Sequence, residues 1–227
     1  MTCVHWRMAL TAALVLGGDA LAASPDLDYM ARLMTTAAAA HQPYPDLVRI
    51  NPALSQADLY AVQQRFVAAQ LAEGASIAGF KGGLVPQAPI GGVLFAEGLH
   101  VSPKTVSRAD FHSLLVEAEI AFEFCTPVSA PLADVAAVKA AVCRLRPAVE
   151  LPDAAIADLG AIKTDLPRLA QALIPTNIAT RDVALGQPVA AAGIDLTTLA
   201  VRTRRDGALL GERVAGPANA AMWEAVR

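Results

Sequence analysis

The pattern of hydrophobic and polar positions changes near residue 76. Before that point, residues 26–41 are rich in Ala, Leu and Met, and residues 57–73 carry apolar side chains at roughly helical spacing. Both patterns predict helices. Ser55 is the expected N-cap of the second helix, and Gly74 is its expected stop. The N-terminal part of the chain is therefore expected to be helical.

From residue 77 onward, short apolar runs are separated by Gly and Pro, which predicts strands joined by tight loops. Strands are expected at 77–84, 91–95, 114–124 and 147–151. Helices are expected at 132–144, at 166–174 and from Pro217, and an Asp-Gly turn predicts a hairpin of 196–202 with 208–213. The fold class is therefore α+β, with helices first and a mixed, mostly antiparallel sheet after them.

The first 22 residues have the pattern of an export signal. Arg7 precedes an apolar run over residues 8–18, and residues 20–22 offer small side chains for a signal peptidase. The run is about half the roughly 20 residues that a membrane-spanning helix needs. A buried N-terminal helix or a misassigned start codon is the alternative. With cleavage near Ala23 the protein would be periplasmic or secreted and would have no membrane span; without a signal it would be cytoplasmic.

The amino-acid composition allows a globular protein and argues against a nucleic acid as its binding partner. The 227 residues are 55% hydrophobic and 17% charged, with a formal net charge of −3, which allows a large core. Aromatic residues make up 5% and no run of Lys or Arg exceeds two residues, so a nucleic-acid surface is not expected. We expect a signal peptide at 1–22, a helical region at 23–75 and a β-rich catalytic domain at 76–227.

The cysteines do not show whether the protein is exported or cytoplasmic. Cys3 falls in the predicted signal, Cys125 lies in a predicted apolar strand, and Cys143 lies in a predicted Ala/Val-rich helix. In an exported protein these two could pair, but both contexts also suit buried thiols. The chain has no CxxC motif or Cys/His cluster, so a structural zinc site is not expected.

The predicted strand at 114–124 carries a row of carboxylates. Because side chains alternate along a strand, Glu117, Glu119 and Glu123 should share one face, and apolar residues should share the other. Carboxylates two residues apart are about 6.5–7 Å apart along the backbone, so their oxygens could converge on one cation. A solvated acidic face is the simpler alternative.

Two further residues favour the cation. Glu150 lies in an otherwise apolar short strand, where a buried carboxylate needs a partner and an edge position is the alternative. Asp153 is a competing ligand candidate. Lys81 stands among glycines, where it could orient a carboxylate or carry a proton, or be a solvated loop lysine.

These motifs occur in the order seen in 2-keto-4-pentenoate hydratases, a family of the fumarylacetoacetate hydrolase superfamily, and the chain resembles that family from about Ser55 to Arg227. The motifs are Ala61-Val62-Gln63, Gly79-Phe80-Lys81-Gly82-Gly83-Leu84, Gly92-Val93-Leu94-Phe95, Val116-Glu117-Ala118-Glu119-Ile120-Ala121-Phe122, Pro147-Ala148-Val149-Glu150-Leu151-Pro152-Asp153 and Asn177-Ile178-Ala179. Each is weak alone, but as an ordered set they are fairly specific.

The resemblance implies a fumarylacetoacetate hydrolase-like mixed β-sandwich or roll with N-terminal helices, assembled as a homodimer or higher homo-oligomer. It implies Mg²⁺ or Mn²⁺ held by Glu117, Glu119 and Glu150, with Lys81 as the catalytic residue. Gly82, Leu84 and Asp153 would contact the substrate. The implied activity is hydration, by a lyase, of a 2-hydroxy-dienoate or 2-oxo acid such as 2-hydroxypenta-2,4-dienoate, as in the breakdown of aromatic compounds.

Among the places where the chain departs from the family pattern, two bear most on activity. It reads Pro89-Ile90-Gly91-Gly92 where these hydratases usually have Pro-Asp-Phe-Gly, so the acid–base carboxylate expected at Ile90 is missing. Residues 221–227 resemble the start of a helix that normally precedes further strands, which implies a shortened C-terminus. Two alternatives therefore stay open: a decarboxylase or C–C hydrolase of a similar acid, and an exported, catalytically reduced protein that binds small acids.

Overall fold

The computed structural model describes residues 25–83, 89–214 and 216–226; the predicted signal and Leu84 lie outside these residues. The helices are α1 (Leu27–Ala39), α2 (Leu47–Ile50), α3 (Gln56–Ala72), α4 (Val135–Ala141), α5 (Leu159–Ile162), α6 (Leu166–Leu173) and α7 (Met222–Ala225). The strands are β1 (Ile77–Gly83), β2 (Ile90–Phe95), β3 (Leu99–Val101), β4 (Glu117–Phe124), β5 (Val142–Leu151), β6 (Asp182–Leu185), β7 (Val189–Ala190), β8 (Ala200–Arg205) and β9 (Ala208–Val214).

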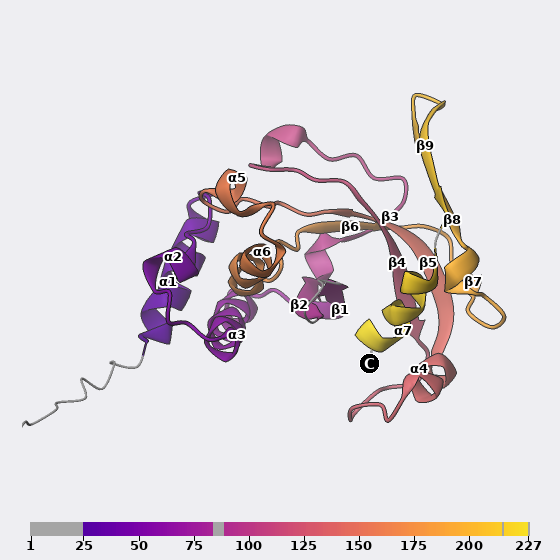
Figure 1. Ribbon diagram of the computed structural model, residues 1–227, viewed down its shortest axis with the longest axis horizontal. Helices are drawn as coiled ribbons and strands as arrows, with labels where there is room; N and C mark the ends of the chain where they lie inside the picture. Colours follow the sequence, from indigo (N-terminus) through magenta and orange to yellow (C-terminus); the bar gives the residue numbers. More distant parts are fainter. Residues whose placement is uncertain (1–24, 84–88, 215, 227) are drawn as a thin grey trace, which may run out of the picture.

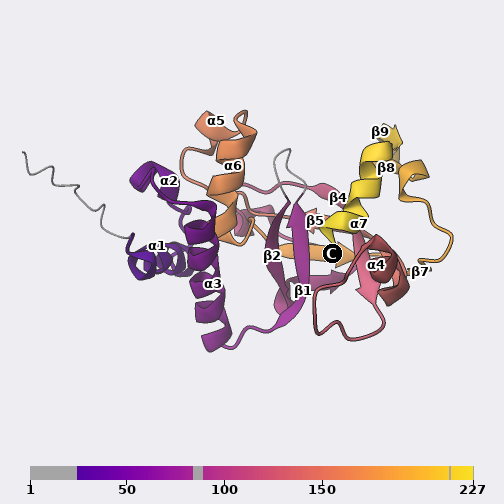
Figure 2. The same cartoon turned by 60° about the horizontal axis from the view of Figure 1, so that its bottom comes forward.

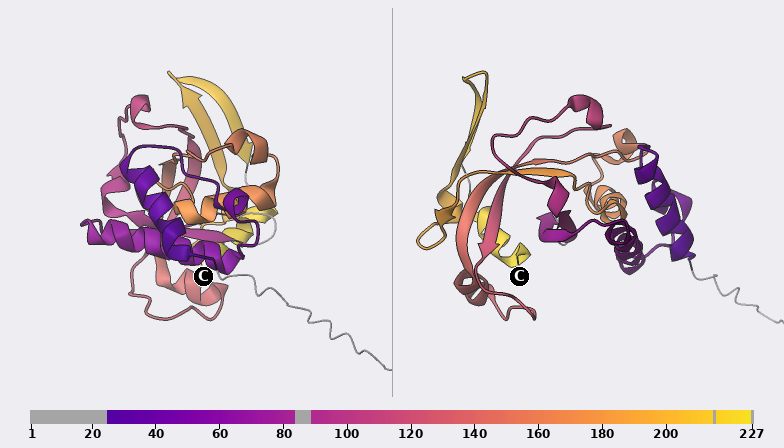
Figure 3. Two further views of the ribbon diagram at one scale, coloured as in Figure 1. Left: turned by 90° about the vertical axis from the view of Figure 1, so that its left-hand side faces the viewer. Right: turned by 180° about the vertical axis from the view of Figure 1, so that it is seen from behind.

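The central sheet has the strand order β3-β6-β5-β4, and β7 adds to β5. The β3–β6 pair is parallel and the other pairs are antiparallel. Two further antiparallel hairpins, β1–β2 and β8–β9, form sheets of their own. Helices α1–α3 lie at one end of the molecule, and β8–β9 projects at the other (Figure 1). The β1–β2 hairpin lies between α3 and the central sheet (Figure 2 and the right-hand view of Figure 3).

One hydrophobic core joins the N-terminal helices to the rest of the chain. Its buried residues include Met34 of α1, Val62 of α3, Ile90 of β2 and Ile174 of the 3-10 helix η3 (Ile174–Thr176). The core therefore crosses the expected boundary between 23–75 and 76–227, so the helical region and the β-rich region pack as one body. No helix in the described ranges is both long and apolar enough to cross a membrane.

A second core lies where the C-terminal helix meets the central sheet. Trp223 of α7 packs edge-to-face on Phe122 of β4, with ring centroids 5.0 Å apart. Val138 of α4 and Leu145 of β5 complete the buried centre of this cluster, together with Leu196. This core supports β4 and β5, the two strands that carry the acidic residues.

Elements with strong local signals form as expected. Asp26 caps α1, and Ser55 forms a capping box with Asp58 at the start of α3, the two bonds being 3.1 and 2.9 Å long. The hairpin turn at Asp206-Gly207 is present, with both residues at positive φ. The first strand of that hairpin begins at Ala200 rather than 196, because a 3-10 turn capped by Asp195 occupies residues 196–198.

The helix expected over 132–144 is wrong at both ends. Asp134 caps α4, its carboxylate accepting the Ala137 N–H at 2.8 Å, and the chain already enters β5 at Val142. Residues 142–146 pair with β4, so β5 is twice as long as the strand expected at 147–151. Pairing with a distant strand therefore overrides the helical preference of this Ala-rich segment.

The strand expected over 114–124 starts three residues later, as β4. Ile120 and Phe122 pack against the second core as expected. Val116, just before the strand, is 70% exposed, and Phe124 at its end is also exposed. The apolar face is therefore half-buried at its centre and exposed at both ends.

Cys125 and Cys143, whose pairing the sequence leaves open, are joined by a disulfide in the structure. Their Cα atoms are 5.7 Å apart, a separation that a disulfide spans readily. The bond ties the end of β4 to the start of β5.

Replacing Gln63 with Leu is expected to lower the free energy of unfolding by about 2 kcal/mol. The buried Gln63 amide donates to the backbone oxygens of Gly91 and Ile174, both at 2.8 Å, and Leu would leave these acceptors unpaired. Urea unfolding measures the loss. Gln64→Leu, at the neighbouring exposed position of α3, is the control and should change stability little. Equal effects of the two substitutions would contradict this role for Gln63.

Candidate metal centre

Strand pairing brings three carboxylates to one place. In the antiparallel β4–β5 pair, Glu117 lies opposite Glu150, and Glu119 lies opposite Ala148. Residues opposite each other point to the same face, and so do residues two apart. Glu117, Glu119 and Glu150 each offer an oxygen within 4.8 Å of the others. The structure thus brings together the three glutamates that the sequence predicts as ligands of one cation, and their binding of a metal ion stays a prediction.

The centre is partly withdrawn from water. The Glu150 side chain is 2% exposed, although it carries a carboxyl group. Burial raises the pKa of the Glu150 carboxyl, and the charge of Lys81 opposes that rise. Burial also raises the pKa of Glu119, and the negative charge of Glu150 adds to the effect. The three carboxylates are therefore costly to ionise together unless positive charge is close.

Lys81 brings one positive charge to the centre. Its ammonium lies 2.7 Å from Oε1 and 2.6 Å from Oε2 of Glu150. The Lys81 side chain is 16% exposed, so this is a mostly buried ion pair between β1 and β5. The solvated loop lysine considered as an alternative is thereby excluded.

The position of Lys81 depends on how its hairpin is anchored. Lys81 lies opposite Gly92 in the β1–β2 register. The next residue, Val93, exchanges two hydrogen bonds with the buried Asn177 side chain, its N–H donating at 2.8 Å and its oxygen accepting at 2.9 Å. Asn177 begins a run of three residues at positive φ with Ile178 and Ala179. This left-handed turn fixes β2, and β2 in turn positions the strand that carries Lys81.

Gln63 and Asn177 support the centre, and the sequence alone gave them no such role. Asn is enriched among the residues that adopt the left-handed conformation, which was a usable local signal. Its partner strand, however, lies 84 residues away along the chain. No spacing rule connects residues so far apart.

The remaining predicted site residues lie outside the carboxylate cluster. The Asp153 carboxylate accepts the backbone N–H groups of His112 and Ser113, at 3.1 and 2.7 Å, and pairs with Arg181. It thus holds the loop that leads into β4. Gly82 lies in β1, and Leu84 is outside the described residues. Contacts of Gly82, Leu84 and Asp153 with substrate stay predictions.

Glu123 and Ile90 have other roles. Glu123 shares the face of Glu117 and Glu119, but its carboxylate is engaged by Arg144 and Arg146. Ile90, where the resembling hydratases carry a carboxylate, is 5% exposed and packs in the first core. The structure thus places an apolar group, with no acid–base capacity, at that position.

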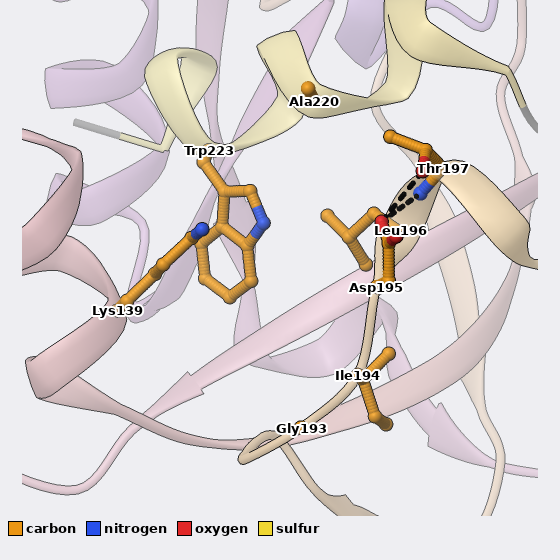
Figure 4. A pocket seen from close by; sticks show the side chains of 8 residues that line it. All are labelled: Lys139, Gly193, Ile194, Asp195, Leu196, Thr197, Ala220 and Trp223. Atoms are coloured by element: carbon orange, nitrogen blue, oxygen red, sulfur yellow. Dashed lines mark hydrogen bonds between the residues drawn. The ribbon is translucent and has the colours of Figure 1, made fainter.

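One cavity of the described structure lies away from the carboxylates. It has a volume of about 330 Å³ and is lined by Lys139, Asp195 and Trp223, among others (Figure 4). The Lys139 ammonium lies 5.4 Å from the centre of the Trp223 ring. Asp195 accepts from the backbone and hydroxyl of Thr197 at 2.9 and 2.7 Å. None of the three glutamates lines this cavity, so it is separate from the carboxylate cluster.

The donor set suits a hard divalent cation. Carboxylate oxygens are the ligands that Mg²⁺, Mn²⁺ and Ca²⁺ prefer, and three of them leave coordination positions for water or a ligand. A cation would also offset the repulsion that raises the pKa of Glu119. Glu117, Glu119 and Glu150 therefore fit such an ion.

The chain is similar to known proteins in sequence and in fold. No family profile matches the sequence. A curated Escherichia coli protein described as 2-oxo-hept-4-ene-1,7-dioate hydratase is 29% identical over 187 residues, which cover 76% of this chain and 70% of that protein.

Two solved structures of 4-oxalocrotonate decarboxylase from Pseudomonas putida G7 share the fold. The structure complexed with magnesium and adipate has a TM-score of 0.74 and 20% identity, covering 88% of this chain and 79% of that one. The structure complexed with calcium and acetate has a TM-score of 0.72 and 20% identity, covering 88% and 78%. In fold, in the order of its motifs and in its similarity to the hydratase relative, the chain resembles the hydratase-like family of the fumarylacetoacetate hydrolase superfamily.

Proposed function

We propose that this protein is a metal-dependent hydratase that acts on a 2-hydroxy-dienoate or 2-oxo acid such as 2-hydroxypenta-2,4-dienoate. The observation that carries the proposal is the convergence of Glu117, Glu119 and Glu150 with Lys81 bound beside them. Hydration is also the reaction in the name of the E. coli relative. The three glutamates would hold Mg²⁺ or Mn²⁺, as magnesium is present in one structure of similar fold.

In this proposal the three glutamates hold the metal ion, and Lys81 interacts with the substrate. The bound ion would supply Lewis-acid stabilisation of negative charge on the substrate oxygens. The reaction moves a proton along the dienol and adds water at the far carbon of the resulting conjugated ketone. Lys81 would hold the substrate carboxylate or carry that proton through its amine. Because Ile90 offers no carboxylate, we assign the proton transfer to Lys81.

Other activities of the same site remain candidates. The solved structures of similar fold are decarboxylases, and decarboxylation or C–C hydrolysis of a 2-oxo acid would use the same carboxylates. The buried, apolar Ile90 favours a third candidate, an exported protein that binds small acids with little turnover. The Cys125–Cys143 disulfide supports export, since disulfides persist in oxidising compartments. Assembly as a homodimer or higher homo-oligomer is part of the proposal.

The test is a metal-binding and turnover assay on the purified chain. We expect Mg²⁺ or Mn²⁺ to bind, and the dienol absorbance of 2-hydroxypenta-2,4-dienoate to fall only when metal is present. A chelator should abolish the activity, and added metal should restore it. Metal binding without turnover on this substrate or 4-oxalocrotonate would favour the binding protein. Failure of the wild-type chain to bind either ion would contradict all three candidates.

A further inference from the structure

The Lys81–Glu150 ion pair occupies the carboxylate oxygens of Glu150, which a metal ion bound by the three glutamates would also need. The Lys81 ammonium contacts both oxygens of Glu150, at 2.7 and 2.6 Å. Glu150 is one of the three residues whose oxygens lie within 4.8 Å of each other. A cation held by all three glutamates must therefore share the Glu150 carboxylate with Lys81 or displace the Lys81 ammonium from it.

We propose that Lys81 sets the balance between metal binding and acid binding at this centre. Lys81 weakens the affinity for a divalent cation, because it competes for Glu150 and repels the cation. Once the cation is bound, Lys81 strengthens the affinity for a ligand that carries a carboxylate. The inference rests on the proposed function, because it requires that the three glutamates bind a metal ion.

Formal charge explains the two opposite effects. With all three carboxylates ionised, the glutamates and Lys81 together carry a net charge of −2. A divalent cation brings this centre to neutrality, and an anionic acid can then approach without net repulsion. If Lys81 were neutral, the loaded centre would keep one negative charge and repel the acid. Since Glu150 is 2% exposed and Lys81 16%, solvent and salt screen these charges weakly.

The Lys81 ammonium can move away from the Glu150 carboxylate because the two residues belong to different sheets. Lys81 comes from the β1–β2 hairpin, whereas Glu150 lies in the central sheet, and no strand of the hairpin pairs with a strand of that sheet. The Lys81 ammonium is at the end of a four-carbon stem, so it can leave Glu150 by a change of rotamer while the backbone of β1 stays in place. The released ammonium would then be available to an incoming carboxylate.

Isothermal titration tests the proposal with two ligands, Mn²⁺ alone and then pyruvate added to the Mn²⁺-saturated protein. Lys81→Met is expected to bind Mn²⁺ about tenfold more tightly and pyruvate about tenfold more weakly than wild type. Lys81→Arg keeps the charge and should stay within about threefold of wild type for both ligands. Lys163→Met removes a charge at an exposed position after α5 and should match wild type. A merely structural lysine would not move the two affinities in opposite directions.

The outcomes separate this proposal from the proposed function. If wild type binds Mn²⁺ and Lys81→Met binds it equally or more weakly, the competition is refuted while the metal centre stands. Unchanged pyruvate affinity in that variant would refute the second half of the proposal. If only Lys81→Met binds Mn²⁺, the competition stands and the metal-dependent function fails; if neither binds, both fail. Lys81→Gln, measured in the same way, replaces Lys81→Met if circular dichroism shows that Met disrupts the fold.

Discussion

Replacing Glu119 with Gln is expected to weaken Mn²⁺ or Mg²⁺ binding at least roughly a hundredfold, since even changes outside the ligand shell cost 10–100-fold in metal affinity. Of Glu119 and Glu150, Glu119 is the candidate ligand whose replacement disturbs fewer contacts within the protein. Among the described residues its carboxylate accepts no hydrogen bond from a protein group, whereas loss of Glu150 would leave Lys81 without its partner. Isothermal titration of the metal gives the affinity directly.

The same substitution should not destabilise the metal-free protein. Burial and the charges of Glu150 and Glu117 raise the pKa of Glu119, so its ionised form is unfavourable in the folded state. A neutral amide of the same shape removes that cost. We therefore expect the urea midpoint of Glu119→Gln without metal to equal or exceed that of wild type. A large fall would mean that Glu119 has a structural role.

Glu123→Gln is the matched control on the same strand and face. Its carboxylate is bound by Arg144 and Arg146, so its replacement should lower stability and leave the metal affinity within about threefold. Equal metal affinities in wild type and Glu119→Gln would show that the glutamate cluster is an acidic surface and not a metal site.

The parts of the fold that depend on nearby residues could be predicted from the sequence. The Ser55 capping box and the Asp206-Gly207 turn each act over a few residues, and they place α3 and the β8–β9 hairpin. The start of β5 could not be predicted in this way. Val142 and Cys143 directly follow α4 in an Ala/Val-rich stretch, and the pairing of this part of the chain with β4 makes it a strand.

In the candidate site, too, the features that depend on nearby residues could be predicted, and those that depend on distant strands could not. Alternation along one strand predicts that Glu117 and Glu119 share a face. That Glu150 lies opposite Glu117 depends on the register of two strands, and residue spacing does not encode that register. The approach of Lys81 depends on a third element, the hairpin that Asn177 anchors. The order of motifs shared with a known family supplied the information that local physics lacked.

Replacing Gly92 with Ala is expected to lower the free energy of unfolding by about 2–4 kcal/mol, through overpacking and lost hydrogen bonds. A Cβ at this position would lie 2.6 Å from the Asn177 Oδ1 atom and 2.9 Å from the backbone oxygen of Asn177. The Asn177 side chain would have to move, and both of its bonds to Val93 would be lost. Asn177 is 1% exposed, so water would not replace them. Urea unfolding measures the change.

Gly91→Ala, one residue earlier in the same strand, separates this steric effect from the general cost or benefit of replacing a glycine. A Cβ at Gly91 would meet only the backbone oxygen of Lys81, at an ordinary contact distance of 3.6 Å. Its N–H would still donate to the Tyr60 hydroxyl, and its oxygen would still accept from Gln63. We expect a change below about 1 kcal/mol, because alanine also restricts the unfolded chain. If Gly92→Ala proved as mild as Gly91→Ala, the close approach of β2 to Asn177 could not be what holds the Lys81 hairpin in place.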